Sequence, residues 1–122
     1  MNARASTRER GAWAEDRACE YLARHGLVAL RRNYRCRHGE IDLVLRDGAT
    51  LVFAEVRYRA HRDRVSGAQS VDAAKQRRLR ASAEHFLQRH REHVECACRF
   101  DVLDICGPEH APQVDWIQDA FQ

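Results

Sequence analysis

Two short extended stretches around a turn signal constrain the fold of this chain most strongly. Residues 41–45 follow a strand pattern, and a second extended stretch covers residues 51–58. Period-two alternation is typical of β-strands, and the Asp47-Gly48 pair between the stretches is a common hairpin turn. The pattern predicts an antiparallel hairpin with a four-residue loop over residues 47–50, in which one face carries Ile41, Leu43 and Leu45.

Two amphipathic helices flank this hairpin in the sequence. Ser6 or Thr7 is expected to cap a first helix that runs to about Arg24. A second helix, with an apolar stripe at helical spacing, is expected from near Ser70 to about Arg91.

Further strands complete the predicted sheet. A short strand is expected within residues 27–37, another over residues 99–106, and an edge strand over residues 113–117. The order of helix, strands, helix and strands predicts an α/β or α+β sandwich with a mixed central sheet flanked by helices. We expect one domain over residues 1–122, with its core at about 8–106 and residues 107–122 packing on that core.

Composition limits where a chain like this works. In 122 residues no apolar run approaches the length of a membrane helix, and the first residues lack the apolar segment of a secretory signal. The five cysteines are an odd number and are expected to be reduced thiols. We therefore expect a cytoplasmic protein with no membrane association.

The distribution of charge favours a polyanionic partner. Residues 57–91 carry ten basic and three acidic side chains, a charge of +7, whereas residues 92–122 carry one arginine and seven acids, a charge of −6. A basic surface on one side of a domain suits nucleic acid. Two oppositely charged solvated faces are the alternative, and charge by itself does not separate the two interpretations.

The predicted hairpin brings two carboxylates together. With the four-residue loop, Asp42 lies opposite Glu55, and Arg57 points to the same face as Glu55. Opposed carboxylates repel each other unless a proton or a cation lies between them, and a hard cation such as Mg²⁺ or Mn²⁺ prefers oxygen ligands. The alternatives are a solvated sheet face, or a one-residue slip that would separate the pair.

Lys75 favours a functional site over a solvated face. It is the single lysine among 21 basic residues, and it shares the apolar stripe of its helix with Val71 and Leu79. On the first helix, Glu15 lies at the edge of the predicted buried side. Acids and a lysine directed inward are costly to bury without a purpose. Glu40 is placed one residue off the face of Asp42, as a supporting acid at most.

The motifs resemble those of the YraN family of uncharacterised bacterial proteins. The resemblance rests on residues 11–15 (Gly-Ala-Trp-Ala-Glu), 39–44 (Gly-Glu-Ile-Asp-Leu-Val) and 52–57 (Val-Phe-Ala-Glu-Val-Arg). It continues through residues 75–79, 99–102 and 116–121, so it covers nearly the whole chain in order.

This family is similar to the restriction-endonuclease-like superfamily, whose motif is an Asp, a strand and then Glu-x-Lys, and to archaeal Holliday-junction resolvases. The resemblance implies that Asp42 and Glu55 are the motif acids and metal ligands, and that Glu15 is an additional helix acid. Arg57 stands where the motif has lysine, so Lys75 is the candidate for a lysine that has moved to a helix. The implied function is an Mg²⁺-dependent or Mn²⁺-dependent nuclease, with the catalytic set Glu15, Asp42, Glu55, Arg57 and Lys75.

Nucleic acid, with DNA favoured over RNA, is the expected partner, and branched DNA and a homodimer are open alternatives. Tyr34 and Tyr58 lie among arginines, as a surface that stacks on bases would require, although the core is favoured for Tyr58, which lies on the opposite strand face from Glu55. A non-catalytic nucleic-acid-binding module on the same fold and a protein-interaction domain are the competing functions. The expected nucleic-acid contacts are Arg35, Arg37, Arg59, Arg62, Arg64, Arg77 and Arg78.

Overall fold

A five-stranded sheet with a helix on each face forms the molecule. The computed structural model describes residues 7–59 and 71–122. The elements, in chain order, are α1 (Thr7–Arg24), β1 (Val28–Cys36), β2 (Gly39–Asp47), β3 (Thr50–Arg59), α2 (Ala73–Arg89), the short 3₁₀ helix η1 (Arg91–His93), β4 (Ala97–Cys106) and β5 (Gln113–Phe121).

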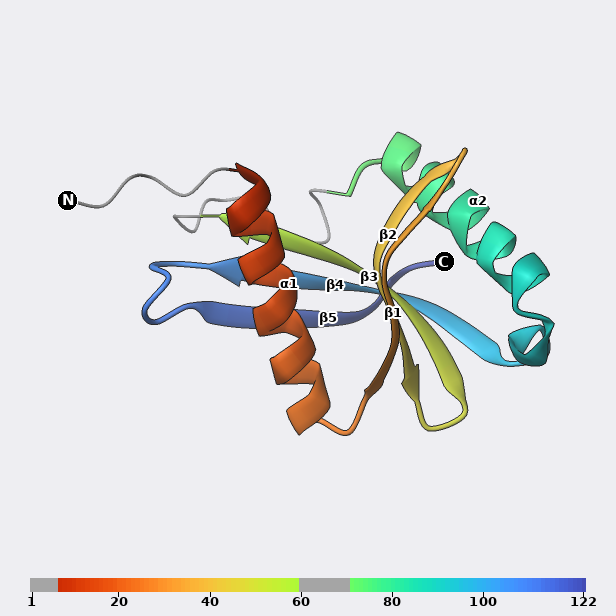
Figure 1. Cartoon of the computed structure of the whole chain (residues 1–122), viewed down its shortest axis with the longest axis horizontal. Helices are drawn as coiled ribbons and strands as arrows, with labels where there is room; N and C mark the ends of the chain where they lie inside the picture. Colours follow the sequence, from red (N-terminus) through yellow and green to blue (C-terminus); the bar gives the residue numbers. More distant parts are fainter. Residues whose placement is uncertain (1–6, 60–70) are drawn as a thin grey trace.

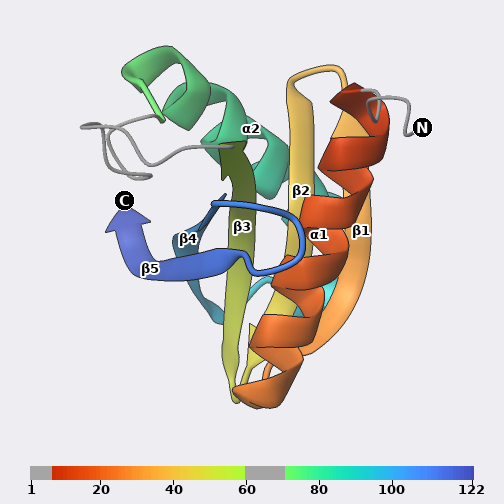
Figure 2. The same cartoon turned by 90° about the vertical axis from the view of Figure 1, so that its left-hand side faces the viewer.

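The sheet is mixed, and its spatial order is the order of the sequence, β1-β2-β3-β4-β5. Neighbouring strands are antiparallel except for β3 and β4, which run parallel because α2 carries the chain across the sheet between them. Figures 1 and 2 show α1 on one face and α2 on the other. This single-domain α+β sandwich, consistent with a nuclease-like fold, confirms the predicted fold class. No helix in the described residues is long and apolar enough to cross a membrane.

Each helix closes a separate half of the core. Under α1, the buried side chains of Ala14, Ala18 and Leu22 pack on Leu43, Leu45, Val52, Ala54, Leu103 and Ile105. Under α2, the buried side chains of Leu79, Ala83 and Phe86 pack on Ile41, Val44, Leu51, Phe53 and Val102. The central strands β3 and β4 are therefore buried on both faces, which is why their apolar residues form nearly continuous runs.

The predicted hairpin register is confirmed, with two differences. Arg46 pairs with Leu51 and Val44 with Phe53, but the loop is only two residues long, since Asp47 also pairs with Thr50. The expectation that Ile41 shares a face with Leu43 and Leu45 is wrong, because Ile41 packs under α2 and the other two pack under α1. The alternation of β2 breaks at Asp42, between Ile41 and Leu43, where the pairing with β3 ends. On β1, the residue between their partners Tyr34 and Arg32 is Asn33, which has a φ of 54°.

The second helix is shorter than predicted because its cap lies further along the chain. The Asp72 side chain accepts a hydrogen bond from the Lys75 backbone N–H at 2.8 Å, and the helix begins at Ala73. It ends at Arg89, two residues before the predicted end. Ser6, one of the two expected caps of the first helix, and Ser70, the expected start of the second, lie outside the described residues. The predicted edge strand is confirmed and extends to Phe121, so the C-terminal segment supplies a full strand of the sheet.

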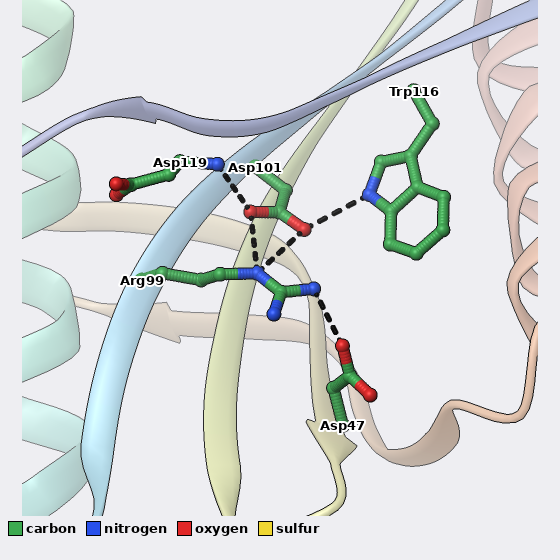
Figure 3. A network of polar contacts seen from close by, with 5 residues as sticks. All are labelled: Asp47, Arg99, Asp101, Trp116 and Asp119. Atoms are coloured by element: carbon green, nitrogen blue, oxygen red, sulfur yellow. Dashed lines mark hydrogen bonds and ion pairs between the residues drawn. The ribbon is translucent and has the colours of Figure 1, made fainter.

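A buried aspartate fastens β5 to β4 (Figure 3). Asp101 is 1% exposed and accepts hydrogen bonds from Arg99 Nε at 3.0 Å, Trp116 Nε1 at 2.9 Å and the Asp119 backbone N–H at 3.0 Å. The pairing of β4 with β5 is irregular next to Asp101, and Asp119 there has a φ of 51°. Arg99 also contacts Asp47 at 2.9 Å, so the network ties the tip of the β2–β3 hairpin to β4. The three donors compensate the desolvation of the carboxylate.

We expect Trp116→Phe to lower the free energy of unfolding by about 2 kcal/mol, because it removes a donor to a buried charged acceptor. Trp13→Phe is the matched control: Trp13 packs edge-on against the Tyr58 ring and has no hydrogen bond through its indole N–H within the described residues. The measurement is urea unfolding followed by circular dichroism. Equal losses of stability in the two variants would show that the indole contributes through its area and not through the hydrogen bond.

Candidate functional site

The site forms where β2 and β3 separate. The two strands pair only as far as Leu43 and Ala54. Beyond this point β2 continues paired with β1, and β3 continues paired with β4 up to Cys106. We call this separation the fork. The backbone N–H of Val56 lies at the fork and donates to Asp42 Oδ2 at 2.8 Å, so a side chain takes the place of the missing strand partner.

Asp42, Glu55 and Lys75 meet at the fork. Asp42 shares a hydrogen bond with the carboxyl group of Glu55, and Lys75 Nζ forms an ion pair with Glu55 Oε2. The Glu55 side chain is 6% exposed and that of Lys75 is 33% exposed. The contact between the two acids that the hairpin predicts is therefore present, although they face each other across the fork and not within the strand ladder. The lysine reaches them from the first turn of α2, where Asp72 holds its backbone N–H.

The electrostatics of the acid pair favour one retained proton. Burial and the neighbouring Glu55 carboxylate raise the pKa of Asp42 well above its ordinary value, and Glu15 adds to the rise, while the Val56 N–H opposes it. Two carboxylates in contact do not both ionise at low cost. Because Lys75 pairs with Glu55, Asp42 is the partner that holds the proton at neutral pH.

Two further acids complete the site. Single carboxylate oxygens of Glu15, Glu40 and Asp42 all lie within 4.8 Å of one another, the one such group in the described residues. The expectation that Glu40 lies off the Asp42 face is wrong, because its carboxylate belongs to this group together with that of Asp42. Two arginines of β1 contact these acids, Arg32 at 3.5 Å from Glu15 and Arg35 at 3.0 Å from Glu40.

The four acids and Lys75 line a pocket of about 420 Å³. Residues of α1 and of α2, which lie on opposite faces of the sheet, both border it. We call it the acid pocket. The sequence-predicted Arg57 and Arg78 line it, as does Glu40, which the sequence places only as a supporting acid. All five residues of the predicted catalytic set therefore lie around one cavity, and they are Glu15, Asp42, Glu55, Arg57 and Lys75.

The residues predicted to contact nucleic acid have different surroundings. Arg77 and Arg78 are on α2, and Arg37 lies at the turn between β1 and β2. Arg59, on β3, instead forms an ion pair at 2.5 Å with the buried Asp104 of the neighbouring strand β4. Arg62 and Arg64 lie outside the described residues.

The expectation that Tyr34 presents its ring to bases is wrong. Tyr34 is 4% exposed and packs edge-on against Phe86 in the core under α2. Tyr58 is also directed into the protein, where it packs against Trp13 and donates a hydrogen bond to the Gly107 carbonyl at 3.1 Å. Both rings lie beside arginines in the sequence, but strand alternation turns them to the core.

The fold and the site define a class, a small α+β sandwich with an acid and lysine pocket at a fork in its sheet. Within that class, the chain belongs to the uncharacterised protein family UPF0102, whose family model matches residues 14–105. This is the YraN family, so the resemblance found in the sequence is confirmed.

Relatives match along almost the whole chain. A UPF0102 protein of Pseudomonas paraeruginosa is 47% identical over 99% of this chain and 98% of its own length. A UPF0102 protein of Methylobacillus flagellatus is 51% identical over 88% of this chain and 92% of its own length. Another, of Alcanivorax borkumensis, is 49% identical over 95% of this chain and 94% of its own length.

We expect Asp42→Asn to stabilise the protein at pH 8 in the presence of a chelator, by about 1–3 kcal/mol. An Asn side chain can accept from the Val56 N–H and donate to Glu55, as a protonated Asp does. The pKa of Asp42 is raised in the folded state. Its contribution to stability is therefore full below the ordinary Asp pKa and is lost as the pH rises towards the raised value.

Urea unfolding of wild type and variant from pH 4 to pH 9 measures this difference. The two stabilities should converge near pH 4 and separate as the pH rises. Glu84→Gln, a neutralised acid on the exposed side of α2, is the control and should show no such divergence. A variant that is less stable than wild type at every pH would contradict the shared-proton arrangement.

Proposed function

We propose that this member of the UPF0102 family is a divalent-cation-dependent nuclease that cleaves phosphodiester bonds of nucleic acid, with DNA favoured over RNA. The observation that carries the proposal is the convergence of acids and a lysine on the acid pocket from four separate elements. Holding the acids there costs free energy, because carboxylates of like charge are brought together at a largely buried position. A binding site for a cation and a phosphate gives these costs a function.

The donor set of the pocket fits a hard divalent cation. Oxygens of Glu15, Glu40 and Asp42 lie close enough to one another to share one ion, and Glu55 contacts Asp42. Mg²⁺ and Mn²⁺ prefer carboxylate oxygens and retain water and phosphate oxygens as their other ligands. Asp42, Glu55 and Glu15, with Glu40, are the proposed ligands. A bound ion of this kind supplies activation of water and neutralisation of charge on the phosphate oxygens.

The basic residues of the acid pocket have separate proposed roles towards the attacking water and the phosphate. Lys75, held against Glu55, orients or deprotonates the attacking water. Arg57 lines the same cavity and holds the phosphate, since a guanidinium binds phosphate oxygens strongly but does not give up its proton. Arg78, at the rim on α2, adds a second cationic group for the nucleic-acid backbone.

Arg57 also supports a second candidate, a non-catalytic nucleic-acid-binding module. It stands at the position where the Glu-x-Lys motif has lysine. If Lys75 does not take over the lysine's role, the pocket retains phosphate binding without efficient hydrolysis. The two candidates share the acid pocket and differ only in whether a bound strand is cut.

We expect Lys75→Arg to abolish Mn²⁺-dependent or Mg²⁺-dependent cleavage, by at least about 100-fold, while DNA binding changes less than threefold. The charge is kept, but an arginine does not relay a proton and its planar head does not fit the place of an ammonium. Arg77→Lys, an equally conservative change at an exposed position of α2, is the matched control and should cleave like wild type.

A panel of single-stranded, duplex and branched DNA, and of RNA, serves as substrates, with binding measured on the same molecules. Arg57→Lys in the Lys75→Arg background restores the Glu-x-Lys motif and is expected to recover part of the activity. Wild type that binds but does not cut with any divalent cation would favour the binding module. Full activity of Lys75→Arg would remove Lys75 from the mechanism.

We expect binding of Mn²⁺ to release close to one proton per ion at pH 7, because the ion takes the place of the proton held by Asp42. Affinity should therefore increase with pH up to the raised pKa of Asp42. Isothermal titration calorimetry in buffers of different ionisation enthalpy counts the released protons. Asp42→Asn should bind at least about tenfold more weakly and release none, and Glu84→Gln should match wild type. Tight binding without proton release would contradict the proposed ligand set.

A further inference from the structure

A second pocket, of different chemistry, lies between β1 and the C-terminal half of α2. Its volume is about 450 Å³, and the residues that line it are Arg31, Tyr34, Arg35, His85, Arg89 and His90. We call it the arginine pocket. No carboxylate is among these lining residues of the described chain, so three guanidinium groups and two imidazoles face one cavity. Such a concentration of cationic groups attracts an anion.

Two of the three arginines of this pocket have no carboxylate partner within the described part of the protein. Arg31 and Arg89 are exposed, and neither pairs with a carboxylate among the described residues. The Arg31 guanidinium lies over the Tyr34 ring, 5.4 Å from its centre, and this cation–π contact holds the arginine side chain beside the cavity. Arg17, by contrast, forms an ion pair with Glu20 at 2.6 Å.

The wall of the arginine pocket is held in place before any ligand binds. The Tyr34 hydroxyl lies 2.6 Å from His85 Nδ1, and burial raises the pKa of the tyrosine, which keeps it a donor. The tautomer in which Nδ1 accepts this hydrogen bond carries its hydrogen on Nε2. His90 stacks on Phe86 at 4.1 Å and contacts the Phe86 carbonyl through Nδ1 at 2.9 Å. Donors fixed in this way bind an anion without a large ordering cost.

One ion pair connects the two pockets. Arg35 lines the arginine pocket, and its Nε lies 3.0 Å from Oε2 of Glu40, which lines the acid pocket. The two cavities therefore lie on either side of a single cross-strand contact between β1 and β2, where Arg35 pairs with Glu40 in the register. A chain of phosphates that enters one pocket has the other directly beside it.

We propose that the arginine pocket binds a backbone phosphate of the same nucleic-acid strand whose scissile phosphate lies in the acid pocket; this inference rests on the proposed function. Guanidinium groups bind phosphate oxygens through paired hydrogen bonds, and His85 Nε2 adds a donor. The strand is thereby anchored at one phosphate and cut at another. Substrates too short to reach both pockets bind weakly.

Charge removal at the two unpaired arginines tests this inference. The double variant Arg31→Ala/Arg89→Ala is expected to bind single-stranded DNA at least tenfold more weakly than wild type. The slope of log affinity against log salt should fall by roughly 0.7 for each phosphate that the variant no longer neutralises. The matched control is Arg24→Ala/Arg46→Ala, which removes the same charge at exposed positions without a carboxylate partner in the described residues and should change binding less than threefold.

Two probes distinguish a strand from a free anion. Labelled oligonucleotides of increasing length report strand binding by fluorescence anisotropy, and inorganic phosphate is titrated while the imidazole NMR signals of His85 and His90 are followed. The proposal expects affinity to rise sharply at one length in wild type and not in Arg31→Ala/Arg89→Ala. Phosphate binding at the histidines with no effect of the double variant on oligonucleotides would overturn it, as would an equal weakening of binding in the control.

The outcome is separable from that of the proposed nuclease activity. A wild type that does not cleave, but whose oligonucleotide binding is abolished in the double variant, supports the arginine pocket and contradicts catalysis. A wild type that cleaves, with unchanged binding and KM in the double variant, supports the nuclease and overturns the arginine pocket.

Discussion

The separation of β2 from β3 is the constraint on which the site depends. A regular ladder would have paired the backbone of Glu55 and Val56 with β2 and left no room for side chains between the strands. Instead β2 follows β1 and β3 follows β4, and the Asp42 carboxyl accepts the Val56 N–H that the ladder leaves without a partner. The same side chain thus satisfies the backbone of the fork and supplies an oxygen to the acid pocket. Asn33, in its left-handed conformation, lies on β1 at this level of the sheet.

The contrast between two aspartates separates a structural site from a functional one. Asp101 is buried with three hydrogen-bond donors around it, so its charge is stabilised inside the protein (Figure 3). Asp42 has one backbone donor and faces other carboxylates, so its charge is opposed. Donors compensate the desolvation of a buried carboxylate, whereas neighbouring carboxylates increase the cost of its charge. The protein retains this cost at Asp42 and removes it at Asp101.

Part of this arrangement was predictable from residues near one another in the sequence. Alternation and the turn at Gly48 indicated the hairpin register, and helical spacing put Lys75 on the inner face of α2. Glu40 was given only a supporting role, off the Asp42 face, through a wrong count along the strand. Ile41 was assigned to the wrong face because the alternation breaks at Asp42, where β2 separates from β3, and no local pattern records that.

The sequence by itself determined which elements form and which way most side chains face, because alternation, helical period and turn chemistry act over a few residues. It also determined the composition of the acid pocket, since its acids and lysine all come from recognisable motifs. Only the tertiary structure decided that β2 and β3 part at Leu43 and Ala54, and that Arg31, Arg89 and His85 converge on one cavity. Those features arise from packing between segments as far apart as β1 and α2, which is a balance over the whole sheet and not a property of any one segment.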